Sequence, residues 1–129
     1  MKNIKIIHFE DNVLKHIAIL RALKEIGITE TVRVGNLEEG IQRIEAEAVS
    51  ENPFNLIITD MHFPLCSGVE ASWKAGEILF EKLQEKEIVI PVVVCSLMNM
   101  KVPGAFGCVW YSELRDWKKE LRELVKKLC

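Results

Sequence analysis

The stretch "LIITDMHFPLCSG" (residues 56–68) begins as an apolar, β-branched run and then stops on an aspartate, Asp60. A short apolar run bounded by turn residues is typical of a strand that is buried on both faces. A proline and a glycine follow, at Pro64 and Gly68, and they indicate a shaped loop beyond the strand. The sequence therefore predicts a buried strand whose carboxyl end presents Asp60.

Apolar runs of the same kind alternate with longer segments of helical periodicity. Strands are predicted at residues 4–9, 31–34, 56–59, 92–96 and 108–111, and helices at residues 13–26, 37–51 and 69–86 and after Ser112. Asn12 is expected to cap the first helix, with Val13 and Leu14 on its apolar face, and Ser112 is expected to cap the last. This alternation predicts a single α/β domain over residues 1–129, with a doubly wound parallel sheet covered by helices on both faces.

Composition narrows the class of protein. The net charge of −2 offers no basic surface for nucleic acid or for a membrane. No apolar run approaches the roughly 20 residues that span a bilayer, and the first residues lack the layout of a secretory signal. The four cysteines, Cys66, Cys95, Cys108 and Cys129, form no C-x-x-C pair, so we expect free thiols in a cytoplasmic protein.

Polar residues end the strands that should lie at the centre of the sheet. Glu10 and Asp11 end the first strand, Asp60 ends the third and Ser96 ends the fourth. For the strand order 2-1-3-4-5, the order reverses between the first and third strands, where such sheets bind ligands. Carboxylates held this close repel one another unless a cation lies among them. The sequence therefore predicts a hard divalent cation, Mg²⁺, at this edge.

These residues also carry a resemblance to a known family. The segments "FEDN" (residues 9–12), "DMHFP" (residues 60–64) with Gly68 eight positions after Asp60, and "VVVCS" (residues 92–96) resemble a response-regulator receiver domain. Receivers are the phosphoacceptor half of two-component signalling, and their sheet is flavodoxin-like. The resemblance covers essentially the whole chain in the order of its elements.

The resemblance implies a role for each of these residues. Asp60 would accept a phosphoryl group from a histidine kinase or phosphotransfer protein, and Ser96 would contact that group. Glu10, Asp11 and Asp60 would hold Mg²⁺ together with the backbone carbonyl of His62. The signal would pass to a downstream protein target. The chain would then be a phosphoacceptor and not an enzyme in its own right, although autophosphatase activity would be compatible with this site.

The sequence departs from the receiver pattern in three places. Receivers carry a lysine just after their fifth strand, but here "WYSELRDW" (residues 110–117) contains none, and Lys118 comes too late. Lys101 is the candidate substitute. Residues 97–106 leave no room for a full fourth helix, which is expected to be short or missing. An insertion is expected around residues 70–76.

Two further hypotheses stay open at this stage. Because the lysine is missing and the fourth helix is reduced, the chain could be a degenerate receiver that acts as a phosphorylation-independent protein-interaction module. A flavodoxin-like enzyme or flavin carrier is the third hypothesis. It is the weakest, because Glu10 and Asp11 stand where such proteins have a loop rich in glycine and hydroxyl groups.

Overall fold

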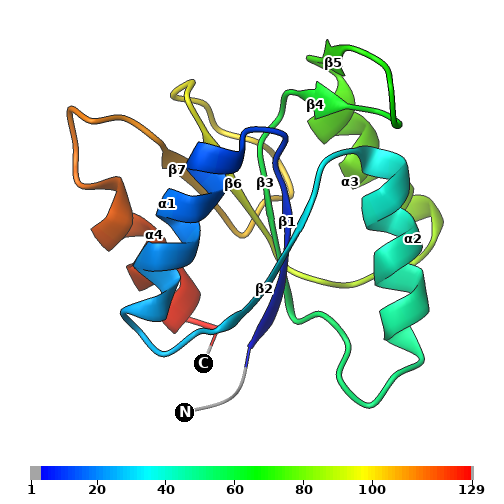
Figure 1. The fold of residues 1–129 in the computed structure, drawn as a ribbon, viewed down its shortest axis with the longest axis horizontal. Coiled ribbons are helices and arrows are strands. Elements are labelled where there is room, and N and C mark those ends of the chain that lie inside the picture. The colour runs from blue at the N-terminus through cyan, green and yellow to red at the C-terminus, as the bar shows by residue number, and fades with distance from the viewer. Residues whose placement is uncertain (1–3, 129) are drawn as a thin grey trace.

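Five parallel strands form the central sheet of the computed structural model, which describes residues 4–128 (Figure 1). In chain order they are β1 (Lys5–Phe9), β2 (Glu30–Val34), β3 (Leu56–Thr59), β6 (Val92–Ser96) and β7 (Gly107–Trp110). Their spatial order is β2-β1-β3-β6-β7. Because β4 and β5 belong to a separate hairpin, this order is the predicted 2-1-3-4-5, and the predicted fold class is confirmed.

Helices cover both faces of this sheet. On one face lie α1 (Val13–Lys24) and α4 (Trp117–Lys126), and on the other lie α2 (Leu37–Ala48) and α3 (Ala75–Glu85) (Figure 1). Each face has its own apolar core, one around Ile6, Ile58 and Leu121 and one around Phe9, Ile57 and Leu79. Residues 97–106 contain bends and turns but no helix, which confirms the prediction that the fourth helix is missing.

The centre of the sheet is the most buried part of the described chain. Every residue of β1 and β3 is buried, as expected for strands with neighbours on both sides and helices on both faces. Phe9 pairs with Thr59 at the ends of these strands, and the Asp60 N–H donates to the Phe9 carbonyl at 3.2 Å. This register places Glu10 and Asp60, the next residue on each strand, at the same edge of the sheet.

The third predicted helix begins later than expected. It was predicted over residues 69–86, but α3 begins at Ala75, and the residues before it form an antiparallel hairpin of β4 (Phe63–Pro64) and β5 (Ala71–Ser72). The connection between the two strands contains Gly68 with a φ of 82°, a conformation that favours glycine. The hairpin therefore occupies part of the expected insertion, and it lies beyond the carboxyl end of β3 (Figure 1).

The start of the last helix also differs from the prediction. Asp116, and not Ser112, is the N-cap of α4, and its side chain accepts a hydrogen bond from the Lys119 N–H at 3.1 Å. The Ser112 hydroxyl instead accepts from the Leu114 N–H at 3.2 Å in the preceding turn. Both residues favour such local hydrogen bonds, so the sequence offered two starting points for this helix.

A close contact fixes the distance between α2 and the sheet. A Cβ atom at Gly40 would lie 2.0 Å from Cε2 of the Phe9 ring. Real atoms do not approach so closely, so the helix can pack at this distance only because residue 40 has no side chain. The glycine that weakens the helical pattern of residues 37–51 is therefore required by packing.

We expect Gly40→Ala to destabilise the protein by about 1–3 kcal/mol, since the added methyl overpacks a buried ring and outweighs the gain in helix propensity. Urea unfolding of Gly40→Ala and of the exposed α2 variant Gln42→Ala provides the comparison. Gln42→Ala should change the free energy of unfolding by less than about 0.5 kcal/mol. A Gly40→Ala protein as stable as the wild type would show that the contact does not limit packing.

Candidate functional site

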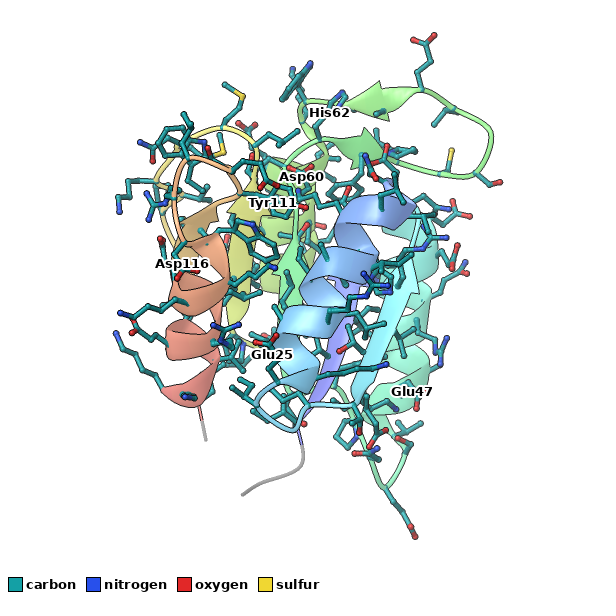
Figure 2. All side chains as sticks on the ribbon, turned by 60° about the vertical axis from the view of Figure 1, so that its left-hand side comes forward. Glu25, Glu47, Asp60, His62, Tyr111 and Asp116 are labelled. Atoms are coloured by element: carbon teal, nitrogen blue, oxygen red, sulfur yellow. The ribbon has the colours of Figure 1, made fainter. Side chains whose placement is uncertain are left out.

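The carboxyl edge of the sheet brings together three of the predicted site residues. Glu10 follows β1, Asp60 follows β3, and Ser96 ends β6, the neighbour of β3. Only 1% of the Glu10 side chain and 14% of the Asp60 side chain are exposed. Figure 2 shows Asp60, His62 and Tyr111 at this end of the molecule, whereas Glu25 and Glu47 lie toward the other.

A lysine that the sequence analysis did not identify lies between the two acids. The Lys15 ammonium is 2.9 Å from Glu10 Oε1 and 3.2 Å from Asp60 Oδ2, and it donates to the Cys95 carbonyl at 2.8 Å. Its side chain is only 5% exposed. A lysine ammonium has three N–H donors, and here three oxygens surround it. The site therefore already contains a cation that belongs to the chain itself.

Backbone groups hold the other oxygen of each carboxylate. Glu10 Oε2 accepts from the Asn12 N–H at 3.1 Å, and Asp60 Oδ1 accepts from the Met61 N–H at 2.7 Å. Asn12 in turn caps α1, because its side chain accepts from the N–H groups of Leu14 and Lys15. This cap fixes the first turn of the helix, and with it the direction in which Lys15 leaves the backbone.

The predicted apolar face of α1 was wrong in its first turn. Val13 and Leu14 were expected to face the core, but both are exposed, Leu14 by 79%. Lys15 is buried instead, on the face that also carries Ile19, Ala22 and Leu23. Counting back along this face from Ala22 through Ile19 in helical steps leads to Lys15. The signal was therefore present, but Val13 and Leu14 at the start of the helix indicated a different apolar face.

Tyr111 is the first residue after β7, the strand that the lysine follows in receivers. Its N–H donates to the Ser96 carbonyl at 2.7 Å, and the Lys15 ammonium lies 5.4 Å from the centre of its ring. The ring packs against Trp117, with 4.6 Å between ring centres. Lys101, the candidate substitute, is exposed, and no ion pair joins it to Asp60 within residues 4–128. The cation that reaches Asp60 is Lys15.

Burial and charge shift the ionisation of this cluster. Burial alone would lower the pKa of Lys15, but the charges of Asp60 and Glu10 outweigh it, and the pKa is raised above its ordinary value. Burial raises the pKa of Glu10 more than Lys15 lowers it. The Cys95 thiol, beside the site on β6, has its pKa raised by burial to about 12. Lys15 is therefore a cation at neutral pH, while Cys95 is an uncharged thiol.

These residues, as arranged, do not fit the predicted Mg²⁺ site. Asp11 is exposed, and among residues 4–128 no group of three or more His, Cys, Asp or Glu side chains is placed to hold a metal ion. The carboxylate oxygens that face the pocket already contact Lys15. At an effective dielectric constant of about 20, a divalent ion about 4 Å from the ammonium would be repelled by roughly 8 kcal/mol. The predicted metal therefore competes with Lys15.

The remaining predicted residues have local roles in the structure. The Ser96 hydroxyl is buried and accepts a hydrogen bond from the Met98 N–H at 3.1 Å. The His62 ring stacks on Trp73 of the hairpin, with 4.0 Å between ring centres. The roles predicted for the Ser96 hydroxyl and for the His62 carbonyl stay predictions.

Exposed apolar side chains surround this edge of the sheet. They come from the first turn of α1, from the residue after β5, from the loop after β6 and from the connection before α4: Val13, Leu14, Trp73, Leu97, Met98 and Leu114. The Trp110 indole N–H donates to the Leu97 carbonyl at 3.0 Å, which ties the last two of these segments together. We call these six residues the apolar rim. Exposed apolar groups of this kind mark surfaces that bind other molecules.

Solved structures show which fold this is. The chain is 18% identical to a CheY-like response regulator receiver domain protein from Methanospirillum hungatei JF-1, covering 98% of this chain and 94% of that one with a TM-score of 0.67. It is 16% identical to the signal receiver domain of a putative Luxo repressor protein from Vibrio parahaemolyticus, covering 98% and 91% with a TM-score of 0.72.

A third match is to a chain in the crystal structure of histidine kinase ThkA in complex with response regulator protein TrrA. The identity is 19%, the match covers 97% of each chain, and the TM-score is 0.69. No protein-family model and no curated protein matches the chain. None of the helices in residues 4–128 has the length and hydropathy needed to cross a membrane. The chain therefore has the fold of response-regulator receiver domains.

We expect Lys15→Met to destabilise the protein by about 3–5 kcal/mol, because it leaves two buried carboxylates without their cation. Chemical unfolding in metal-free buffer measures the loss. The control is Lys24→Met, which removes an exposed lysine from the last turn of the same helix and should cost less than about 1 kcal/mol. Equal losses in the two variants would show that the ion pairs of Lys15 add nothing.

The buried His8 side chain makes the folding stability of the protein depend on pH. His8 of β1 is fully buried, and its Nδ1 lies 2.9 Å from Nδ1 of His16. Burial lowers the pKa of His8 well below 6.5, and the charges of His16, Lys15 and Arg33 lower it further. The unfolded chain takes up a proton near pH 6.5 that the folded protein does not, so folding stability is full above that pH and falls below it.

We expect His8→Leu to remove this loss. The free energy of unfolding of the wild type should fall relative to that of His8→Leu below about pH 6.5, by up to about 1.4 kcal/mol per pH unit. Urea unfolding of both proteins between about pH 8 and pH 5 measures the difference. A difference that stays constant over this range would mean that His8 does not resist protonation.

Proposed function

We propose that this receiver-fold chain is a signalling module that binds a partner protein and does so without phosphorylation of Asp60. The observation that carries the proposal is the ion pair between Lys15 and Asp60. A receiver of the ordinary kind uses its aspartate as a nucleophile, whereas here both oxygens of that carboxylate are already engaged. Asp60 is therefore part of a buried ion-pair cluster with Lys15 and Glu10.

Two features of receivers are missing here, and their absence supports the same proposal. The lysine expected after β7 is absent from residues 110–117, and no helix lies between β6 and β7 within the described residues. In receivers these parts contact the phosphoryl group and change the surface that it controls. Without that helix, a phosphoryl group on Asp60 would change less of the surface.

The apolar rim indicates where the partner binds. Its side chains lie at the edge of the sheet that carries the ion-pair cluster, and the most exposed of them, Leu114, is 89% exposed. Such residues cost solubility unless they are covered, so we assign the rim to a protein partner. The free thiols Cys66, Cys95 and Cys108 fit a reducing compartment, and we place the protein in the cytoplasm.

Phosphoryl transfer to Asp60 is the second candidate function. It is favoured by the placement of Glu10, Asp60 and Ser96 at one edge of the sheet, as in the sequence prediction. One structure with a matching chain holds a response regulator in complex with a histidine kinase. In this alternative the partner is a histidine kinase or phosphotransfer protein, and Asp60 becomes an acyl phosphate.

Incubation with acetyl phosphate, with and without Mg²⁺, followed by intact-mass measurement, separates the two functions. We expect no added phosphoryl group in the wild type, because the Asp60 carboxylate is held by Lys15 and by the Met61 N–H. The matched control is Asp60→Asn, which removes the acceptor. A phosphoryl group that appears on the wild type and is absent from Asp60→Asn would overturn the proposal and establish the second candidate.

A further inference from the structure

We propose that the Lys15 ammonium is a tethered replacement for a divalent cation. The wild-type pocket then excludes Mg²⁺ and Mn²⁺, and removal of the Lys15 charge opens a divalent-cation site on Glu10 and Asp60. This inference concerns what neutralises the pocket. The proposed function concerns what Asp60 does in signalling, so the two can fail separately.

The charges of the pocket require a cation. Glu10 and Asp60 are carboxylates from two adjacent strands, and the Glu10 side chain is almost completely removed from water. Two such groups are tolerated together only with a positive charge between them. The contacts of Lys15 at 2.9 Å and 3.2 Å supply that charge from within the chain.

Lys15 contacts oxygens that a metal at this edge would need. Mg²⁺ requires about six oxygen ligands at about 2.0–2.1 Å. Two of the oxygens that would bind it, Glu10 Oε1 and Asp60 Oδ2, are the atoms that the ammonium contacts. A third oxygen, the Cys95 carbonyl, also accepts from Lys15 at 2.8 Å. A metal bound to these three oxygens would therefore have to displace Lys15.

The surrounding residues hold the Lys15 side chain in place. Asn12 fixes the backbone of its helical turn, and the Tyr111 ring lies beside the ammonium and packs on Trp117. A cation attached to the chain is always present at high effective concentration, whereas a free ion must be captured from solution. The positive charge of Lys15 is therefore present beside the two carboxylates at any concentration of metal.

Mn²⁺ is the probe that tests this inference, because its sharp paramagnetic resonance signal broadens when the ion binds. The samples are the wild type, Asp60→Asn, Lys15→Met and the double variant Lys15→Met/Asp60→Asn, all stripped of metal. We expect the wild type and Asp60→Asn to remove equally little free Mn²⁺. Lys15→Met should bind Mn²⁺ about tenfold or more tightly than the wild type, and the double variant should lose that binding.

Two results would overturn the inference. One is a Mn²⁺ site in the wild type that is missing from Asp60→Asn, because the ion would then bind beside Lys15. The other is a folded Lys15→Met protein that binds Mn²⁺ no better than the wild type. If Lys15→Met folds only when Mg²⁺ is added, the metal has replaced the ammonium and the inference is supported.

A second variant covers the case in which Lys15→Met does not fold at all. Lys15→Gln removes the charge but keeps a donor for the Cys95 carbonyl, and it should gain Mn²⁺ binding in the same way. A comparison of Mn²⁺ binding by the wild type and by Asp60→Asn tests whether the wild type excludes the metal, and it needs no change at Lys15. If acetyl phosphate labels Asp60 without Mg²⁺, the proposed function is overturned and this inference is not. If the wild type binds Mn²⁺ but takes up no phosphoryl group, this inference is overturned and the proposed function is not.

Discussion

The contact of one buried ammonium with two buried carboxylates is the interaction on which the rest of the site depends. Lys15 joins α1 to the ends of β1, β3 and β6 through Glu10, Asp60 and the Cys95 carbonyl. None of these charges would be stable there alone, because burial of an unpaired charge is far more costly than its exposure. The carboxyl edge is therefore closed by the chain's own cation, and what remains for a partner is the apolar rim around it.

Much of the fold was predictable because its central strands carry an unambiguous pattern. The bounds of β3 and β6 are those predicted, since each is an uninterrupted apolar run that ends on a polar residue. The β4–β5 hairpin was not predictable in the same way, because two-residue strands have no period to detect. The start of α4 was missed because Ser112 and Asp116 are both capable caps, and tertiary packing of Trp117 decides between them.

The candidate site, like the fold, was predictable from the sequence only in part. Glu10, Asp60 and Ser96 were predicted to meet because parallel strands end at one edge of a sheet, and the register of β1 with β3 confirms this placement for the two acids. Lys15 was missed because the exact phase of α1 decides which residues of its first turn face inward. The sequence pattern favoured Val13 and Leu14, but the Asn12 cap and the packing of Ile19 rotate them to solvent. The chemistry of Glu10 and Asp60 therefore depends on Lys15, which lies on α1 and not on the strands that the two acids follow.

The receiver fold accounts for the layout of the chain, and Lys15 accounts for the ion pairs at its carboxyl edge. The most direct measurement of the central claim is the ¹⁵N resonance of the Lys15 ammonium by nuclear magnetic resonance. A buried ammonium that contacts two carboxylates should exchange its protons slowly enough to be seen at neutral pH, and its signal should move in Asp60→Asn. A Lys15 signal that exchanges as fast as those of the exposed lysines, and that ignores the Asp60 substitution, would contradict the account.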